Sequence, residues 1–177
     1  MADSTNGSAK SSQGSGQGSG QSSGQAAGQG APQIQVRVIS QYIKDLSFEN
    51  PNVARFLSTT GGNPNLRLEI TVNAQKMEEK VFESAITLTA QATNETGVIY
   101  DLENVYAGLF QVEGLPEAQL EPFLLIHCPT LIFPFQRRLV ADVTREGGFP
   151  PLLIDPIDFG ALYAQKAQQA AGKSAVS

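Results

Sequence analysis

The sequence is poor in the residues that most often carry chemistry: its 177 positions include one cysteine, one histidine and no tryptophan. A single cysteine excludes a disulfide within the chain and agrees with a reducing compartment. One histidine and one cysteine also fall short of the ligand set that zinc requires. The sequence has no HExxH motif and no glycine-rich phosphate loop, so it carries no signature of metalloprotease or nucleotide chemistry. We therefore expect no metal, no cofactor and no enzymatic activity.

Large apolar residues are missing from positions 1–33, which contain no Ile, Leu, Val, Phe or Tyr. The stretch SSQGSGQGSGQSSGQAAGQG consists almost only of Ser, Gly and Gln. Such a segment buries too little apolar surface to offset the entropy lost on ordering, so residues 1–32 are predicted to form a disordered tail. The sequence also lacks a signal-peptide pattern and any apolar run of the about 20 residues that span a membrane. We expect a cytoplasmic protein that does not insert into membranes.

Basic residues are missing from a long internal interval. No Lys or Arg lies between Lys80 and Arg137, although Asp and Glu recur throughout that interval. A surface of this sign repels phosphate, which argues against nucleic acid as a partner. Two interpretations stay open from these residues alone: a docking surface for a basic protein, or a solvated acidic face that only favours solubility.

Strand patterns dominate the first half of the remaining chain. Residues 66–75 alternate apolar and polar side chains, which is typical of a strand with one buried face. The NETG sequence at 94–97 predicts a hairpin turn in which Gly97 adopts a positive φ. Strands joined by short connections predict an antiparallel sheet with one polar face. The four predicted strands cover residues 34–48, 66–75, 81–93 and 98–110.

Helical patterns follow the strands, which makes the predicted fold α+β. One helix is predicted over 116–127, and residues 130–148 carry one apolar stripe in which every fourth residue is apolar. Prolines within this region predict breaks or kinks. A last helix is predicted to begin after Asp158, its N-cap, and to end at Gly172. The stripe consists of Leu131, Phe135, Leu139 and Val143, and the prolines are Pro122, Pro129 and Pro134.

Part of this helical region is apolar on more than one side, and the sheet leaves two edges open. Both features predict that part of the region packs against another subunit. The apolar residues concerned are Phe123, Leu124, Leu125, Ile126, Leu131, Ile132, Phe133 and Phe135.

His127 and Cys128 are adjacent, which raises the question of a catalytic pair. Neighbouring residues on a helix point about 100° apart, so the two side chains do not face each other as a nucleophile and its base must. Apolar neighbours would raise the pKa of the thiol rather than lower it. We predict that the sulfur packs in a core and that the histidine is structural.

Two blocks of the sequence resemble SecB, a family of bacterial protein-export chaperones. They are IKDLSFENPN (43–52) and CPTLIFPFQRRLVADVTREGGFPPLLIDPIDFGALY (128–163), in the order and spacing of that family. The resemblance covers residues 33–166, which would form the SecB-like chaperone domain, and leaves 167–177 as a frayed C-terminal segment. It implies a four-stranded antiparallel sheet followed by kinked helices and assembled as a dimer of dimers, a homotetramer. It also implies an ATP-independent chaperone that holds unfolded precursor proteins in an export-competent state and delivers them to the SecA motor.

The resemblance implies two kinds of site. Acidic residues on the exposed sheet face would dock the small basic zinc-binding tail of SecA, with the zinc belonging to that partner. Apolar residues in and after the first strand would line a client groove, although each could also pack in the core. The predicted SecA-binding residues are Asp45, Glu49, Asp101 and Glu103, and the predicted client-binding residues are Tyr42, Leu46, Phe48, Phe56 and Leu57.

Two other functions stay open from the residues alone. A hydrophobic small-molecule (lipid or acyl) binding protein with a hot-dog-like fold would wrap a curved sheet around a helix. An acyl enzyme of this kind would need His127 or Glu121 at the helix mouth, and both lie in proline-interrupted segments. A purely structural assembly protein would have no affinity for unfolded chains.

Overall fold

The computed structural model of the chain describes residues 34–52, 64–95 and 97–174. The predicted tail at 1–32 and the groove candidates Phe56 and Leu57 lie outside these residues. Within them, no helix is long and apolar enough to cross a membrane.

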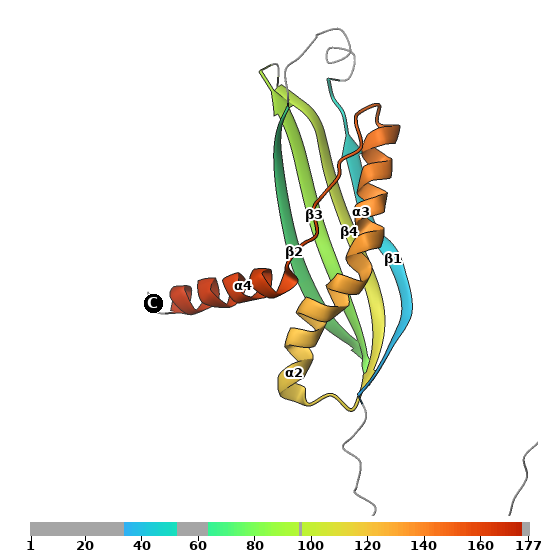
Figure 1. Cartoon of the computed structure of the whole chain (residues 1–177), viewed down its shortest axis with the longest axis vertical. Coiled ribbons are helices and arrows are strands. Elements are labelled where there is room, and N and C mark those ends of the chain that lie inside the picture. The colour runs from blue at the N-terminus through green and yellow to red at the C-terminus, as the bar shows by residue number, and fades with distance from the viewer. Residues whose placement is uncertain (1–33, 53–63, 96, 175–177) are drawn as a thin grey trace, which may run out of the picture. The chain divides into compact units, whose positions relative to one another are not determined.

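The strands form one antiparallel sheet in the order β1-β4-β3-β2, so β1 and β2 are its edges (Figure 1). The four predicted strands are confirmed, and their observed ends differ from the predicted ones by at most three residues. Gly97, at the turn before the fourth strand, has a φ of 121°, which confirms the predicted positive φ. The strands are β1 (Gln35–Glu49), β2 (Asn65–Glu78), β3 (Val81–Asn94) and β4 (Gly97–Glu113).

A kinked helical segment crosses one face of this sheet, here called the helix side (Figure 1). It consists of α2 (Glu117–Pro122), the π-helical turn η1 (Phe123–His127) and α3 (Cys128–Glu146). Pro122 ends α2 where the π turn begins, because a proline has no N–H for the helical ladder. The predicted α+β fold with kinked helices is confirmed.

The buried row of α3 differs from the predicted stripe. Leu131 and Phe135 are 50% and 44% exposed, whereas Leu139 and Val143 are partly buried against the core, so only the second half of the predicted stripe faces the core. The buried row lies one residue further along and includes Gln136 and Thr144, whose polarity hides it from a hydrophobicity pattern. The buried residues of α3 are Cys128, Pro129, Ile132, Phe133, Gln136, Val140 and Thr144.

Hydrogen bonds compensate the buried side-chain amides, except at Gln136 Oε1, which is buried without a partner among the described residues. Gln136 Nε2 donates to the Ile86 carbonyl at 3.1 Å and to Asn104 Oδ1 at 3.0 Å. Asn104 Nδ2 in turn donates to the carbonyl of Asp45 in β1 at 3.0 Å. Side-chain amides therefore connect α3 through β3 and β4 to the edge strand, at a depth where an unpaired polar group is costly.

β1 contains two residues without a partner in β4, Ile39 and Lys44, and the second changes which side chains face the helices. Ile43 pairs with Tyr106 and Asp45 pairs with Val105, so Lys44 is the unpaired residue of a β-bulge. Side chains alternate between the two faces of a strand, and an extra residue shifts that alternation. Leu46 and Phe48 thus lie on the helix side together with Ile43, whereas Asp45 turns to the opposite face.

The last helix of the described residues is α4 (Phe159–Ser174). Asp158 Oδ1 accepts a hydrogen bond from the Ala161 amide at 2.9 Å, which confirms the predicted N-cap. The helix continues two residues past Gly172, the predicted end. At the edge of the sheet, Lys166 Nζ of α4 donates to the Val72 carbonyl of β2 at 3.3 Å.

Gly147, directly after α3, supports an aromatic cluster. The Phe48 ring lies 5.7 Å from Tyr100 and 6.4 Å from Phe149, centroid to centroid. A Cβ atom at Gly147 would overlap the Phe48 ring. Because Phe48 is held by its two aromatic neighbours, the ring cannot move away without breaking those contacts.

We predict that Gly147→Ala lowers the free energy of unfolding by about 1–3 kcal/mol through this overlap, as overpacking usually does. The φ of −70° at Gly147 accepts alanine, so backbone strain does not contribute. Denaturant unfolding measures the loss. In a Phe48→Leu background, where the ring is absent, Gly147→Ala should lower the free energy of unfolding by less than it does in the wild type. Wild-type stability of Gly147→Ala would show that Phe48 is free to move.

Candidate binding surfaces

The two faces of the sheet differ in what covers them. The helix side is packed by α3 over β3 and β4 and by η1 over β2 and β3. The opposite face, here called the outer face, has no helix over it in the described part of the chain (Figure 1). The core lies on the helix side, and its fully buried sheet residues include Ile86, Leu88, Leu102 and Phe110.

The register places the four predicted SecA-binding residues on the outer face. Glu49 pairs with Asp101, and Glu103 pairs with Ser47. Asp45 shares this face because of the bulge at Lys44. The residues that alternate with the acids of β4 are Leu102 and Asn104, and both are buried on the helix side. All four carboxylates are exposed. We call Asp45, Glu49, Asp101 and Glu103 the acidic patch.

A shallow hollow of about 200 Å³ within this patch is lined by Ser47, Glu49, Asp101 and Glu103. Asp101 also borders a second hollow, where its carboxylate accepts a hydrogen bond from Gln91 Nε2 at 3.0 Å. The arginine that lines this second hollow, Arg67, is paired with Glu69 at 2.5 Å. The sheet thus presents carboxylates whose oxygens are available to basic groups of a partner.

A second charged cluster on the outer face centres on Glu83, which is buried with a 5% exposed side chain. Glu83 Oε1 accepts hydrogen bonds from Lys44 Nζ at 2.6 Å and from Gln75 Nε2 at 2.8 Å. Tyr42 donates its hydroxyl to Oε2. We call Tyr42, Lys44, Gln75 and Glu83 the Glu83 cluster.

The Glu83 cluster shifts the pKa values of two of its members. Burial would raise the pKa of the Glu83 carboxyl, but the hydrogen bonds from Lys44, Tyr42 and Gln75 and the lysine charge together hold it below its ordinary value. The hydrogen bond to Glu83, with burial and the carboxylate charge, raises the pKa of Tyr42 to about 12. Glu83 is therefore a carboxylate at neutral pH, and Tyr42 remains a donor.

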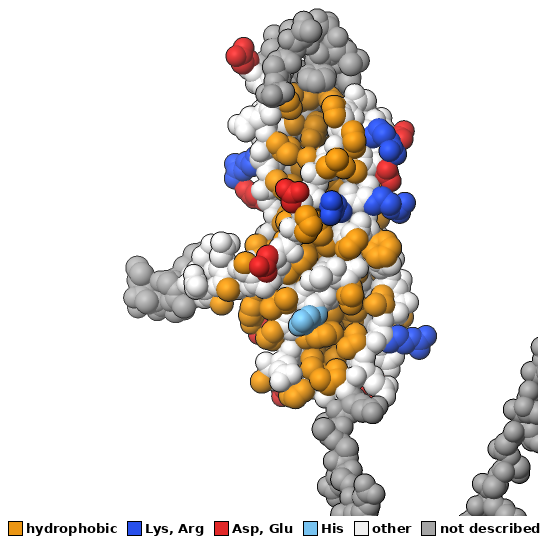
Figure 2. Space-filling view, in the orientation of Figure 1, with side chains coloured by type: hydrophobic (Ala, Val, Ile, Leu, Met, Phe, Trp, Pro, Cys, Tyr) orange, Lys and Arg blue, Asp and Glu red, His pale blue; other side chains and the backbone are white. Residues whose placement is uncertain are grey.

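The helix side carries exposed apolar residues next to α3. In Figure 2, apolar side chains gather over this face, with few charges among them. On β1 they form an exposed row, and on α3 they are the exposed first half of the predicted stripe. We call these residues the apolar surface: Val36, Val38, Ile43, Leu46, Leu131 and Phe135.

The predicted client-binding residues do not share one face. Leu46 is exposed within the apolar surface, and Phe48 lies on the same side but is half-buried in its aromatic cluster. Tyr42 points to the outer face, where it belongs to the Glu83 cluster. The structure therefore brings Leu46 and Phe48 together on one face and separates Tyr42 from them.

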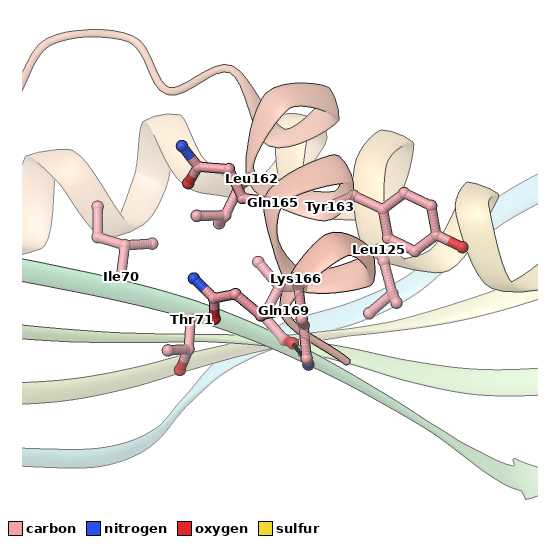
Figure 3. Close-up of a pocket in the computed structure, with 9 residues that line it drawn as sticks. Ile70, Thr71, Leu125, Leu162, Tyr163, Gln165, Lys166 and Gln169 are labelled. Carbon is pink, nitrogen blue, oxygen red and sulfur yellow. Dashed lines mark hydrogen bonds between the residues drawn. The ribbon is translucent and has the colours of Figure 1, made fainter. Parts of the chain in front are cut away.

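Two hollows along β2 lie outside the predicted SecA-binding and client-binding sites. The first, of about 350 Å³, lies between β2, Leu125 of η1, and Leu162 and Tyr163 of α4 (Figure 3). The second, of about 440 Å³, continues along residues 73–76 of β2 toward α2, and Lys166 lines both. The alternation of β2 was visible in the sequence, but it indicated only a strand with one buried face.

The adjacent His127 and Cys128 do not form a reactive pair. His127 is exposed and stacks on Phe123 with ring centroids 5.4 Å apart. Cys128 is fully buried, and burial raises the pKa of its thiol to about 12, which confirms the predicted buried sulfur. Glu121, the other candidate for acyl chemistry, is also exposed. Among the described residues, no group of three His, Cys, Asp or Glu could hold a metal ion.

Comparison with known proteins supports a binding role. The family described as preprotein translocase subunit SecB matches residues 29–170. The protein-export protein SecB of Parvibaculum lavamentivorans is 48% identical over 81% of this chain and 85% of its own length. That of Maricaulis maris is 50% identical over 77% of this chain and 80% of its own length.

A solved structure has the same fold at low sequence identity. It is a Mycobacterium tuberculosis SecB-like chaperone in complex with a ChAD peptide from the HigA1 antitoxin. It matches with a TM-score of 0.55 and 15% identity, over 69% of this chain and 90% of that chain. Family profile, relatives and fold agree: this chain belongs to the SecB family of protein-export chaperones, which are not enzymes.

Proposed function

We propose that this chain holds unfolded precursor proteins without ATP and delivers them to the SecA motor. The observation that carries the proposal is the division of the sheet into an apolar surface on one side and an acidic patch on the other. The first suits the apolar segments of an unfolded polypeptide, and the second suits a basic partner. A protein that must hold one chain and dock on another needs two such chemically distinct surfaces.

Client holding would depend on apolar burial. Unfolded chains expose apolar side chains, and each Å² that is removed from water contributes about 25 cal/mol. The sequence carries no phosphate-binding loop that would couple this binding to ATP. The mycobacterial SecB-like chaperone with its bound ChAD peptide supports peptide binding by this fold.

We further propose that part of the apolar surface is buried between copies of the chain in a homotetramer, a dimer of dimers. The exposed residues of β1 and α3 are contiguous with an open sheet edge, where backbone groups lack strand partners. A second copy of the same surface would cover both features at once. Clients would then occupy the apolar residues that the assembly leaves free.

SecA docking would depend mainly on charge. The four exposed carboxylates of the acidic patch would attract the basic tail of SecA over a distance of about one Debye length, or about 10 Å at 0.1 M salt. Zinc, where required, would belong to SecA.

For assembly, we predict that Phe135→Glu splits the tetramer, because it places a charge in a buried apolar contact. Light scattering coupled to size exclusion should give about four times the 18.8 kDa chain mass for wild type and a smaller mass for the variant. Leu153→Glu is the matched control, since Leu153 is 75% exposed in the linker before α4. A monomeric wild type at micromolar concentration would contradict the proposal.

For client holding, we predict that the protein suppresses the aggregation of a refolding polypeptide in the absence of ATP. The light scattering of the refolding polypeptide should fall as the chaperone is added in stoichiometric amounts. Because apolar binding is strengthened rather than screened by salts such as sulfate, the suppression should persist at high ionic strength. Unchanged scattering at several-fold excess would refute client holding.

For docking, we predict that reversing all four acids of the acidic patch to lysine weakens binding of the zinc-loaded SecA tail by at least about tenfold. Titration calorimetry measures the affinity, and the aggregation assay should be unaffected. A control variant changes four exposed acids outside the patch to lysine, which gives the same change in net charge. It should bind the tail nearly as well as wild type. Full affinity of the patch variant would place docking on another surface. The control acids are Glu78, Glu79, Glu95 and Asp155.

A further inference from the structure

The bulge in β1 places a base directly beside the acidic patch. Lys44 is the extra residue of the bulge, and Asp45 follows it in the sequence. Both side chains lie on the outer face, because the bulge interrupts the alternation that would otherwise separate them. A lysine in this position is unfavourable for a surface whose proposed partner is basic.

Glu83 holds this lysine away from the patch. The Lys44 Nζ atom lies 2.6 Å from Glu83 Oε1, although the two residues belong to strands separated by β4. Lys44 therefore reaches across the neighbouring strand toward the middle of the sheet. A lysine side chain is long and flexible, so only a strong partner keeps it in one such conformation.

The other contacts of Glu83 fix the carboxylate in place. Tyr42 and Gln75 approach it from β1 and β2, the two edge strands, and occupy it together with Lys44. A buried carboxylate with this many donors is stable as an anion and retains its ionic partner. Its charge and that of Lys44 cancel locally, which leaves the four acids of the acidic patch as the net charge beside them.

We propose that Glu83 is a specificity-determining residue of the acidic patch, which acts by withholding Lys44 from it. The inference depends on the proposed docking of a basic partner. If Glu83 were neutral, Lys44 would be free to turn toward Asp45 and the neighbouring acids. One lysine at such distances would offset part of the attraction that a basic peptide receives.

The test is a cycle of variants titrated with the zinc-loaded SecA tail at low salt. Glu83→Gln should weaken binding about three- to tenfold, the effect of adding one free positive charge within about 6 Å of a docking site in high dielectric. Adding Lys44→Met to Glu83→Gln should restore the wild-type affinity to within about twofold. A residue with a merely structural role would not be rescued by removing a second contact from the same cluster.

The matched control removes another lysine. Lys76→Met in the Glu83→Gln background changes the net charge equally, but Lys76 does not belong to the Glu83 cluster, so affinity should stay low. The milder Glu83→Asp keeps the charge and shortens the side chain. It should give an intermediate loss, which Lys44→Met again restores, and it serves if Glu83→Gln lowers the thermal midpoint too far.

The outcomes separate the inference from the proposed function. If the wild type binds the tail and Glu83→Gln binds it with equal affinity, the inference is overturned and the proposed docking stands. Failure of Lys44→Met to rescue, or equal rescue by Lys76→Met, would also overturn it. Wild type that does not bind the tail would overturn the proposed docking and the inference together.

Discussion

The arrangement of both surfaces depends on one constraint: a strand must alternate its side chains between two faces, and β1 interrupts that alternation at two extra residues, Ile39 and Lys44. At Lys44 the excess residue is accommodated as a bulge. On one side of it, Ile43 faces the helices, and on the other side Leu46 and Phe48 do so as well. The same step turns Asp45 and Glu49 to the outer face. Without it, apolar and acidic residues would mix on both faces.

The bulge is stabilised from inside the protein rather than from its surface. Asp45, directly after the bulge, directs its carbonyl to the side-chain amide of Asn104, which in turn accepts a hydrogen bond from Gln136 of α3. Both amides are fully buried, so leaving either one unpaired would cost about 1–3 kcal/mol. The position of the helix and the register of the edge strand are thus coupled, and each helps to define the other.

The sequence predicted the parts of the fold that depend on simple periodicity. Alternation identified the strands, Gly97 marked the hairpin turn, and Asp158 marked the start of the last helix. The buried row of α3 was missed because Gln136 and Thr144 interrupt its apolar pattern. Gln136 finds its hydrogen-bond partners far away in the sequence, in β3 and β4, whereas Thr144 bonds to Val140 and Leu152 close by. The acids of the patch were named through the family resemblance, and their common face follows from the bulge. The three-residue step between Ile43 and Leu46 was the one local sign of that bulge. The Glu83 cluster could not be foreseen, since its members come from three strands.

The contact between Lys166 and the Val72 carbonyl has a consequence for the behaviour of the protein at high concentration. An edge strand with free carbonyls can template the addition of an identical strand from a second molecule, and repeated addition leads to fibrils. At Val72 an ammonium group occupies the acceptor that such a strand would need. Lys166, which lies in the middle of α4, therefore interrupts the edge near its middle and disfavours continuous pairing along β2. Natural edge strands use inward-pointing lysines in the same way, and here the lysine comes from a helix instead of the strand itself.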